Sequence, residues 1–118
     1  IAEAARALGR LTIVIASSDF THHGYIYDYV VFHEKPNEGV KLMDSEYIGK
    51  ILTFDTEGFL EAVRRNQGTV CGVGAVAAVI EYSKLMDAKA RLLKYYTSAD
   101  VTGDEDIVVG YAAIEFFK

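Results

Sequence analysis

The sequence predicts an α/β fold in which a mixed sheet is flanked by helices. The run LTIVIA, residues 11–16, is continuously apolar, as is typical of a strand buried on both faces of a parallel sheet. Two later runs, residues 90–97 and 106–117, have the composition of strands, and the polar stretch 98–106 between them is typical of a loop. Segments with helical spacing lie between the first strand and the last two. This order of elements indicates an α/β architecture.

The first forty residues give two further predictions. Residues 1–8, IAEAARAL, have helical spacing, and Gly9 provides the stop. Residues 25–41 are ambiguous, because YIYDYVVF is compatible with either a strand or a helix. KPNEG, around the only proline, is predicted to form an exposed turn.

Three helices are predicted in the middle of the chain. The first covers about residues 45–54. The second begins at position 55 or 56 and reaches position 66, with Asp55 as a suitable N-cap and an apolar stripe on one face. The third, Ala-rich and apolar, is predicted as a buried helix from position 72 or 74 to 86. It would begin directly after Cys71.

The composition predicts one domain over residues 1–118. Hydrophobic side chains make up 51% of the chain and charged ones 25%, enough apolar material for a core. The net charge of −5 and the absence of a basic cluster argue against nucleic acid and anionic membranes as partners. No apolar run is long enough to span a membrane. A single cysteine fits a reducing, cytoplasmic location.

The beginning of the chain has an unusual form. It opens at Ile1 without an initiator Met and inside a helical pattern, which favours a fragment of a longer protein. The alternative is a complete domain whose initiator has been removed or whose tail precedes this segment.

The stretch SSDFTHHG, Ser17 to Gly24, follows the first predicted strand, at the sheet edge where α/β proteins bind ligands. Asp19 and His22 are three residues apart, so a turn can bring the carboxylate and the imidazole together for proton transfer or metal binding. The alternative is that Asp19 caps backbone amides and the histidines are ordinary surface residues. His23 has no predicted role.

Cys71 precedes a predicted helix, whose dipole favours the thiolate that binds soft metals or acts as a nucleophile. The alternative is a small core side chain. Ser98 and Asp100 are predicted as loop caps or as the lip of a cleft. Two classes of function follow: a metal or Cys/His site built from Asp19, His22 and Cys71, or a module that binds a peptide or small molecule without turnover.

Four segments, ASSDFTHHGYIY, TVCGVG, YYTSAD and VGYAA, resemble the C-terminal half of the Memo family, the B component of the AmmeMemoRadiSam set. The resemblance covers nearly the whole chain, and family members are about twice as long. It implies a fold similar to that of class III extradiol dioxygenases, of which this chain would form only the C-terminal part. One departure is Ala75, where the family usually has a proline.

The resemblance also implies a cleft lined by Asp19, His22 and Cys71, together with histidines from the family's N-terminal half, which have no counterpart here. Copper binding with redox activity has been assigned to family members, with the cysteine as a ligand; iron or zinc are alternatives. Animal members also act as adaptors in cell motility. We expect the remaining cleft residues to be Ser17, Ser18, Gly72, Ser98 and Asp100. The expected partners are the N-terminal half of the same protein and a small molecule or peptide. Redox or oxygenase-type activity is therefore the leading expectation, with a binding module and a metal-free Cys/His hydrolase as alternatives.

Overall fold

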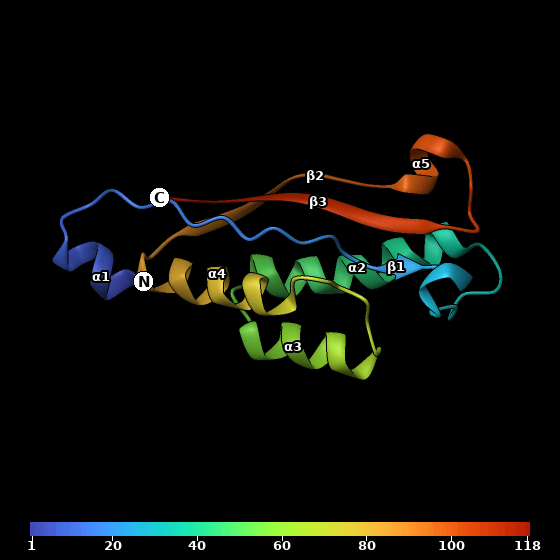
Figure 1. Cartoon of the computed structure of the whole chain (residues 1–118), viewed down its shortest axis with the longest axis horizontal. Coiled ribbons are helices and arrows are strands. Elements are labelled where there is room, and N and C mark those ends of the chain that lie inside the picture. Colours follow the sequence, from blue (N-terminus) through green and yellow to red (C-terminus); the bar gives the residue numbers. More distant parts are fainter.

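The computed structural model describes all residues from Ile1 to Lys118 and has an elongated shape of 51 × 27 × 22 Å (Figure 1). Helices and strands follow one another as α1 (Ala2–Ala7), β1 (His22–His23), α2 (Pro36–Leu52), α3 (Thr56–Arg65), α4 (Val73–Leu85), β2 (Lys89–Thr97), α5 (Ser98–Thr102) and β3 (Val108–Phe117), with a 3-10 turn η1 (Tyr25–Tyr27) after β1. The sheet lies on one side of the molecule, and α2, α3 and α4 lie on the other (Figure 1).

The sheet has three strands in the order β1-β3-β2, and both pairings are antiparallel. In the long β2–β3 pair, Lys89 lies opposite Phe117 and Thr97 lies opposite Gly110. The predicted mixed sheet is therefore wrong for this chain, although helices and strands do combine as expected. A connection of ten residues folds β3 back beside β2, and strands joined in this way pair antiparallel.

The apolar run 11–16, predicted to be a buried strand, forms no strand. It runs extended along α4 and the end of β3 (Figure 1), and no backbone hydrogen bond ties it to either. Leu11, Ile13 and Ile15 expose 99%, 82% and 84% of their surface. The prediction failed because a strand needs a neighbour, and none of these 118 residues supplies one.

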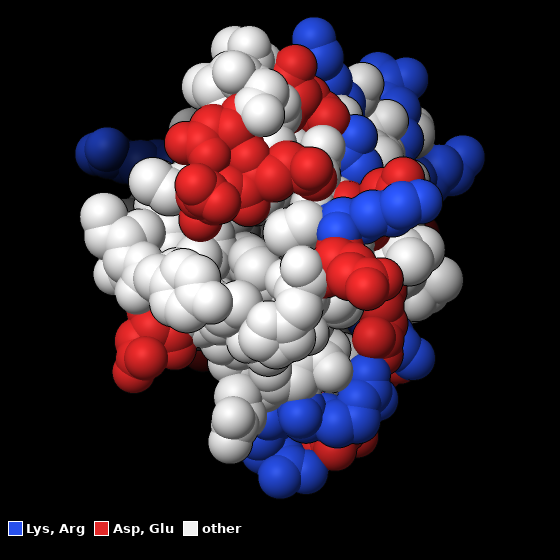
Figure 2. Space-filling model, turned by 90° about the vertical axis from the view of Figure 1, so that its right-hand side faces the viewer, with Lys and Arg blue, Asp and Glu red and all other residues white.

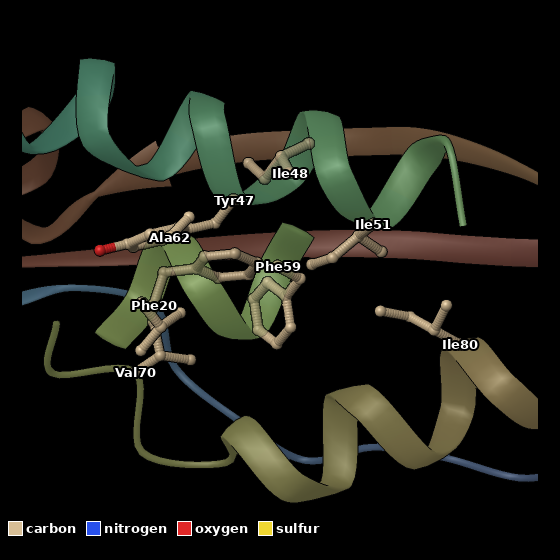
Figure 3. Close-up of a cluster of buried hydrophobic side chains, with 9 residues drawn as sticks. Phe20, Tyr47, Ile48, Ile51, Phe59, Ala62, Val70 and Ile80 are labelled. Atoms are coloured by element: carbon tan, nitrogen blue, oxygen red, sulfur yellow. The ribbon is translucent and has the colours of Figure 1, made fainter. Parts of the chain in front are cut away.

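The core lies between α2, α3 and α4, where Tyr47, Ile51, Phe59 and Ile80 converge (Figure 3). The predicted cap of α3 is confirmed, because the Asp55 carboxylate accepts a hydrogen bond of 2.9 Å from the Gly58 amide. The bounds of α4 also agree with the prediction to within a residue or two. Its predicted burial is wrong, however, since only Val79, Ile80 and Ser83 are buried and the opposite face is open.

The segment around the proline differs from its prediction. KPNEG is not a free turn: α2 begins at Pro36 and continues through the region predicted to start at position 45. Proline suits the first helical position because the amide it lacks has no partner there. The ambiguous YIYDYVVF forms neither a strand nor a regular α-helix. Its first three residues form the 3-10 turn η1. No helix has both the length and the apolar composition needed to cross a lipid bilayer.

The predicted loop 98–106 contains the short helix α5. Its start is a reciprocal cap, in which the Thr97 hydroxyl accepts from the Asp100 amide and the Asp100 carboxylate accepts from the Thr97 amide. Lys41 and Asn37 of α2 also bind Asp100, and these contacts lower the pKa of its carboxyl to about 2, Lys41 contributing most. Asp100 therefore connects the C-terminal end of β2 to α2.

A buried carboxylate links the helical layer to the sheet. Asp44 of α2 is completely buried and accepts hydrogen bonds from the Thr21 amide (3.1 Å), the Thr21 hydroxyl (2.5 Å) and the Tyr95 hydroxyl (2.6 Å). Burial raises the pKa of Asp44, while these hydrogen bonds act in the opposite direction. Gly110 lies against the same carboxylate, and any side chain there would collide with it.

We expect Asp44→Ala to lower the free energy of unfolding by about 2–4 kcal/mol, because Thr21 and Tyr95 would be left with buried, unpartnered donors. Tyr95→Phe, which removes a single donor, should cost only about 1 kcal/mol. Urea unfolding of both variants measures the difference. Equal effects of the two changes would contradict a central role for the carboxylate.

Candidate functional site

Two loops that are about fifty residues apart in the sequence meet beside β1. The Thr69 hydroxyl accepts a hydrogen bond from the His22 amide (2.7 Å) and donates one to the His22 carbonyl (2.8 Å). Further along the same loop, the Asp19 amide donates to the Cys71 sulfur over 3.2 Å. The structure thus brings Asp19, His22 and Cys71, the three residues predicted from the sequence, to one place.

Gly72 and Ser18 hold the two loops at close range. The Gly72 amide donates to the Ser18 hydroxyl over 2.9 Å, and that hydroxyl lies 2.8 Å from the Asp19 carbonyl, to which it donates. A Cβ at position 72 would come within 2.6 Å of the Ser18 Cβ and 2.8 Å of the Ser17 carbonyl oxygen. Only glycine fits this approach. Ser17, Ser18 and Gly72 therefore lie where the two loops meet.

The His22 ring has a defined orientation. Its Nδ1 lies 3.0 Å from both the Phe20 and the Thr69 carbonyl oxygens. Carbonyl oxygens only accept hydrogen bonds, so Nδ1 carries a proton, and Nε2 is the ring nitrogen left for other partners. Nε2 faces the Asp19 carboxylate at 3.6 Å, with Asp19 about half exposed. The Tyr27 ring packs edge-on against the imidazole at 5.1 Å between centroids.

This arrangement gives His22 the properties of a base. A proton taken up at Nε2 would create an imidazolium held by two carbonyls on one side and a carboxylate on the other. The ring is partly accessible, with 19% of its side chain exposed, so a ligand can reach it. The predicted Asp19–His22 pair is present in the structure.

Cys71 is a free, exposed cysteine directly before α4. Its sulfur accepts the Asp19 amide and has the Ser18 hydroxyl 3.8 Å away. Within these 118 residues Cys71 is therefore not a core side chain. No hydrogen bond joins Cys71 to His22, so a Cys/His pair is not formed in the structure.

The site has side chains of the types that bind a soft metal, but too few of them are grouped to hold one. An imidazole with a free lone pair and a thiol are the ligands that copper and zinc prefer. However, no group of three or more His, Cys, Asp or Glu side chains in the chain is arranged to hold a metal ion. This chain by itself therefore does not complete a metal centre.

Ser98 and Asp100, predicted to line the cleft, bind elsewhere. The Ser98 hydroxyl donates to the Ile107 carbonyl and accepts from the Val109 amide, which fastens α5 to β3. Asp100 binds α2 and caps its own helix. None of their hydrogen bonds reaches Asp19, His22 or Cys71, so the structure supports their alternative role as caps.

His23, which had no predicted role, is a core residue. It is 2% exposed, and its Nε2 accepts the amides of Val31 and Phe32, both at 3.1 Å. Its Nδ1 carries the proton and has no hydrogen-bond partner in the chain. Phe32 stacks on the ring at 5.6 Å. Adjacent residues of β1 point to opposite faces, so His22 faces the site and His23 the interior.

Sequence reasoning missed Thr69, Asp44 and Tyr27. Thr69 precedes the cysteine in TVCG, and a hydroxyl two residues before a candidate ligand was the available signal. Asp44 lies in an otherwise ordinary helical pattern, and nothing local marks it as buried.

The surface seen in Figure 2 has separate acidic groups divided by uncharged side chains, with basic side chains toward its margins.

The family model for Memo-like proteins matches residues 1–115. This chain belongs to the Memo family. Two of its relatives are the MEMO1 family proteins of Pyrococcus abyssi, 50% identical over 116 residues, and Pyrococcus horikoshii, 48% identical over 118. These alignments cover 95% and 97% of this chain but 40% of each relative. A MEMO1 family protein of Methanopyrus kandleri is 43% identical over 98% of this chain and 38% of its own length.

The resemblance noted in the sequence is thereby confirmed at the level of the family. This Memo chain spans about two fifths of the length of the curated relatives that it matches. The loops that carry Asp19, His22 and Cys71 lie inside the matched region.

We expect the stability of this Memo chain to fall as the pH drops below about 6.5. Burial, with a smaller contribution from His33, lowers the pKa of His23 below its ordinary value of 6.5. In that range His23 is protonated in the unfolded chain but stays neutral in the folded chain, so acid favours unfolding. Urea unfolding between pH 8 and pH 5 measures the slope. His23→Gln should flatten it and His33→Gln should largely keep it; a slope unchanged by His23→Gln would contradict the assignment.

Thr69→Val should lower the free energy of unfolding by about 1–3 kcal/mol, because the amide and carbonyl of His22 lose their partner. The 15N chemical shifts of the His22 ring should also move toward a mixture of tautomers as the Thr69 carbonyl shifts. Thr53→Val, at the end of α2, is the matched control, since that hydroxyl binds only its own helix. Unaltered ring shifts in Thr69→Val would show that Thr69 does not position His22.

Proposed function

We propose that this chain supplies one wall of a ligand cleft in a Memo-family protein with redox or oxygenase-type activity on a small molecule. The observation that carries the proposal is the double role of Asp19. Its amide binds the Cys71 sulfur while its carboxylate faces His22 Nε2. Asp19 therefore connects the thiol to the imidazole through its amide on one side and its carboxylate on the other.

In this proposal the Asp19–His22 pair holds and moves a proton. Nδ1 is fixed by two carbonyls, so a proton from the ligand has one place to go, the Nε2 lone pair. The carboxylate at 3.6 Å then stabilises the imidazolium. Tyr27 contacts the ring in a T-shaped arrangement.

Cys71 is proposed as the contribution of this chain to a metal centre. Copper is the first candidate because thiolate and imidazole are soft or borderline ligands, with zinc and iron as alternatives. The further ligands would come from the part of the protein outside these 118 residues. Copper held there would supply one-electron chemistry. We propose a cytoplasmic location, which the single free cysteine supports.

A binding module without turnover is the second candidate. It is favoured by an apolar groove of about 920 Å³ between residues 11–16, α4 and β3, which suits a protein or peptide segment. The Cys/His hydrolase has no such support, because its nucleophile and base are not hydrogen-bonded to each other.

Metal titration tests the first candidate. In a protein in which this chain continues over the full length of its relatives, Cys71→Ser should weaken Cu(I) binding by more than about 100-fold, beyond the loss typical of a residue that only orients a ligand. Ser98→Ala is the matched control, since its hydroxyl binds only the Ile107 carbonyl and the Val109 amide. The 118-residue chain alone should bind weakly.

The outcomes separate the candidates. Tight binding that depends on Cys71 supports the metal centre. Tight binding that survives Cys71→Ser removes the cysteine from the ligand set. Absence of binding in the full-length protein, combined with unaltered peptide binding in Cys71→Ser, favours the module.

A further inference from the structure

Two tyrosines lie side by side on one face of the β2–β3 pair. Tyr96 is directly opposite Tyr111, and the centroids of their rings are 5.4 Å apart. Their neighbours in the two strands, Tyr95 and Gly110, face Asp44 of α2. Adjacent residues of a strand point to opposite faces, so Tyr96 and Tyr111 lie on the face that is turned away from Asp44.

The candidate site lies on the same face of the sheet. His22 of β1 is opposite Val109, which is two residues before Tyr111 in β3. Residues opposite each other, and residues two apart in one strand, share a face, so His22 and Tyr111 lie on the same one. Tyr27 adds a third phenol ring, which packs edge-on against His22. We refer to Tyr27, Tyr96 and Tyr111 as the tyrosine cluster.

A carboxylate belongs to this cluster. The side chain of Asp19 is 48% exposed; its ion-pair partner is His22, and neither a lysine nor an arginine pairs with it. Burial raises the pKa of Tyr111, and the charges of Asp19, Tyr27 and Tyr96 raise it further, with Asp19 the strongest of the three. These three groups therefore surround the Tyr111 hydroxyl.

The rings of the cluster are open to a ligand. Tyr27 and Tyr96 expose 38% and 40% of their surface. The faces of phenol rings carry partial negative charge and attract cations. The structure contains one such contact, because the Lys94 ammonium lies over the Tyr96 ring, 5.7 Å from its centroid. Aromatic rings beside a carboxylate that has no basic partner favour a positively charged ligand.

We propose that the tyrosine cluster and Asp19 bind the ammonium group of an organic cation, such as a quaternary or alkylated amine. This inference rests on the proposed function, since it names the class of small molecule that the cleft takes. A neutral aromatic molecule would stack on the rings but gain nothing from the carboxylate. An anion would be repelled by Asp19.

The proposal has a consequence for the chemistry of the site. An ammonium group held by Asp19 would place the rest of the ligand beside His22, because the carboxylate and the imidazole are 3.6 Å apart. A quaternary ammonium carries no N–H. A proton that reaches His22 Nε2 would therefore come from a different part of the ligand.

Calorimetric titration with a matched pair of probes tests the proposal. A protein in which this chain continues over the full length of its relatives is titrated, in EDTA, with choline and with dimethylbutanol, the uncharged molecule in which carbon replaces the nitrogen of choline. The two probes have the same shape and differ in charge. We expect choline to bind at least about 10-fold more tightly.

Variants of the cluster separate the ring from the hydroxyl. Tyr96→Leu and Tyr111→Leu remove a ring and should each weaken choline binding by about 3- to 10-fold. The corresponding Phe variants keep the ring and should stay within about 2-fold of the parent. Tyr82→Leu is the matched control, since Tyr82 of α4 lines the apolar groove together with Ala112 and Ile114, on the opposite face of β3 from Tyr111. Circular dichroism verifies the fold of each variant.

Two charge variants test the electrostatic part of the proposal. Asp19→Asn should weaken choline binding by about 10-fold or more, because the carboxylate supplies the countercharge. Lys94→Met removes a cation from the Tyr96 ring and should strengthen choline binding by about 2- to 5-fold. A gain in affinity cannot come from a loss of folded protein.

Three results would overturn the proposal. They are absence of choline binding, equal affinity for choline and dimethylbutanol, and choline binding that the Leu variants of Tyr96 and Tyr111 leave unaltered. Cu(I) binding is measured separately on the same protein without EDTA. Metal binding without choline binding would refute the organic cation and retain the proposed metal centre, whereas choline binding without metal binding would do the reverse.

Discussion

The Asp44 carboxylate is the interaction on which the rest of the structure depends. It lies in the interior between α2 and the sheet and takes all its hydrogen bonds from Thr21 and Tyr95. A buried acceptor with these donors fixes Thr21 in one position, since any displacement leaves polar groups unpartnered. Thr21 precedes His22, so the direction in which the imidazole points is set by a residue of α2.

The loop 18–22 is held by two sets of contacts. Asp44 binds Thr21, and the segment 69–72 binds the loop through the Thr69 hydroxyl, the Cys71 sulfur and the Gly72 amide. Each set binds a backbone group or a short side chain, which leaves little freedom. These contacts leave the Asp19 carboxylate and the His22 Nε2 for a ligand, whereas the Cys71 sulfur both binds the Asp19 amide and is exposed.

Sequence patterns located the helices of the core and the long strand pair, because apolar periodicity and caps such as Asp55 are local properties. They also selected Asp19, His22 and Cys71, with the family motifs in support, and the structure brings these three residues together. They misplaced residues 11–16 and the start of α2, and they did not decide between a cap and a cleft position for Ser98 and Asp100. Those errors share one cause: burial, pairing and capping depend on segments distant in the sequence, such as α2 for Asp100.

The sequence by itself determined the family, the reactive residue types and the apolar character of residues 11–16. Only the tertiary structure decided which histidine faces the site and which the core, that the Asp19 amide reaches the Cys71 sulfur, and that the apolar segment has no partner. The physical reason is that composition and period fix what a segment can bury. Contacts between segments about fifty residues apart decide which partner a side chain or a backbone amide binds. No local sequence pattern contains that information.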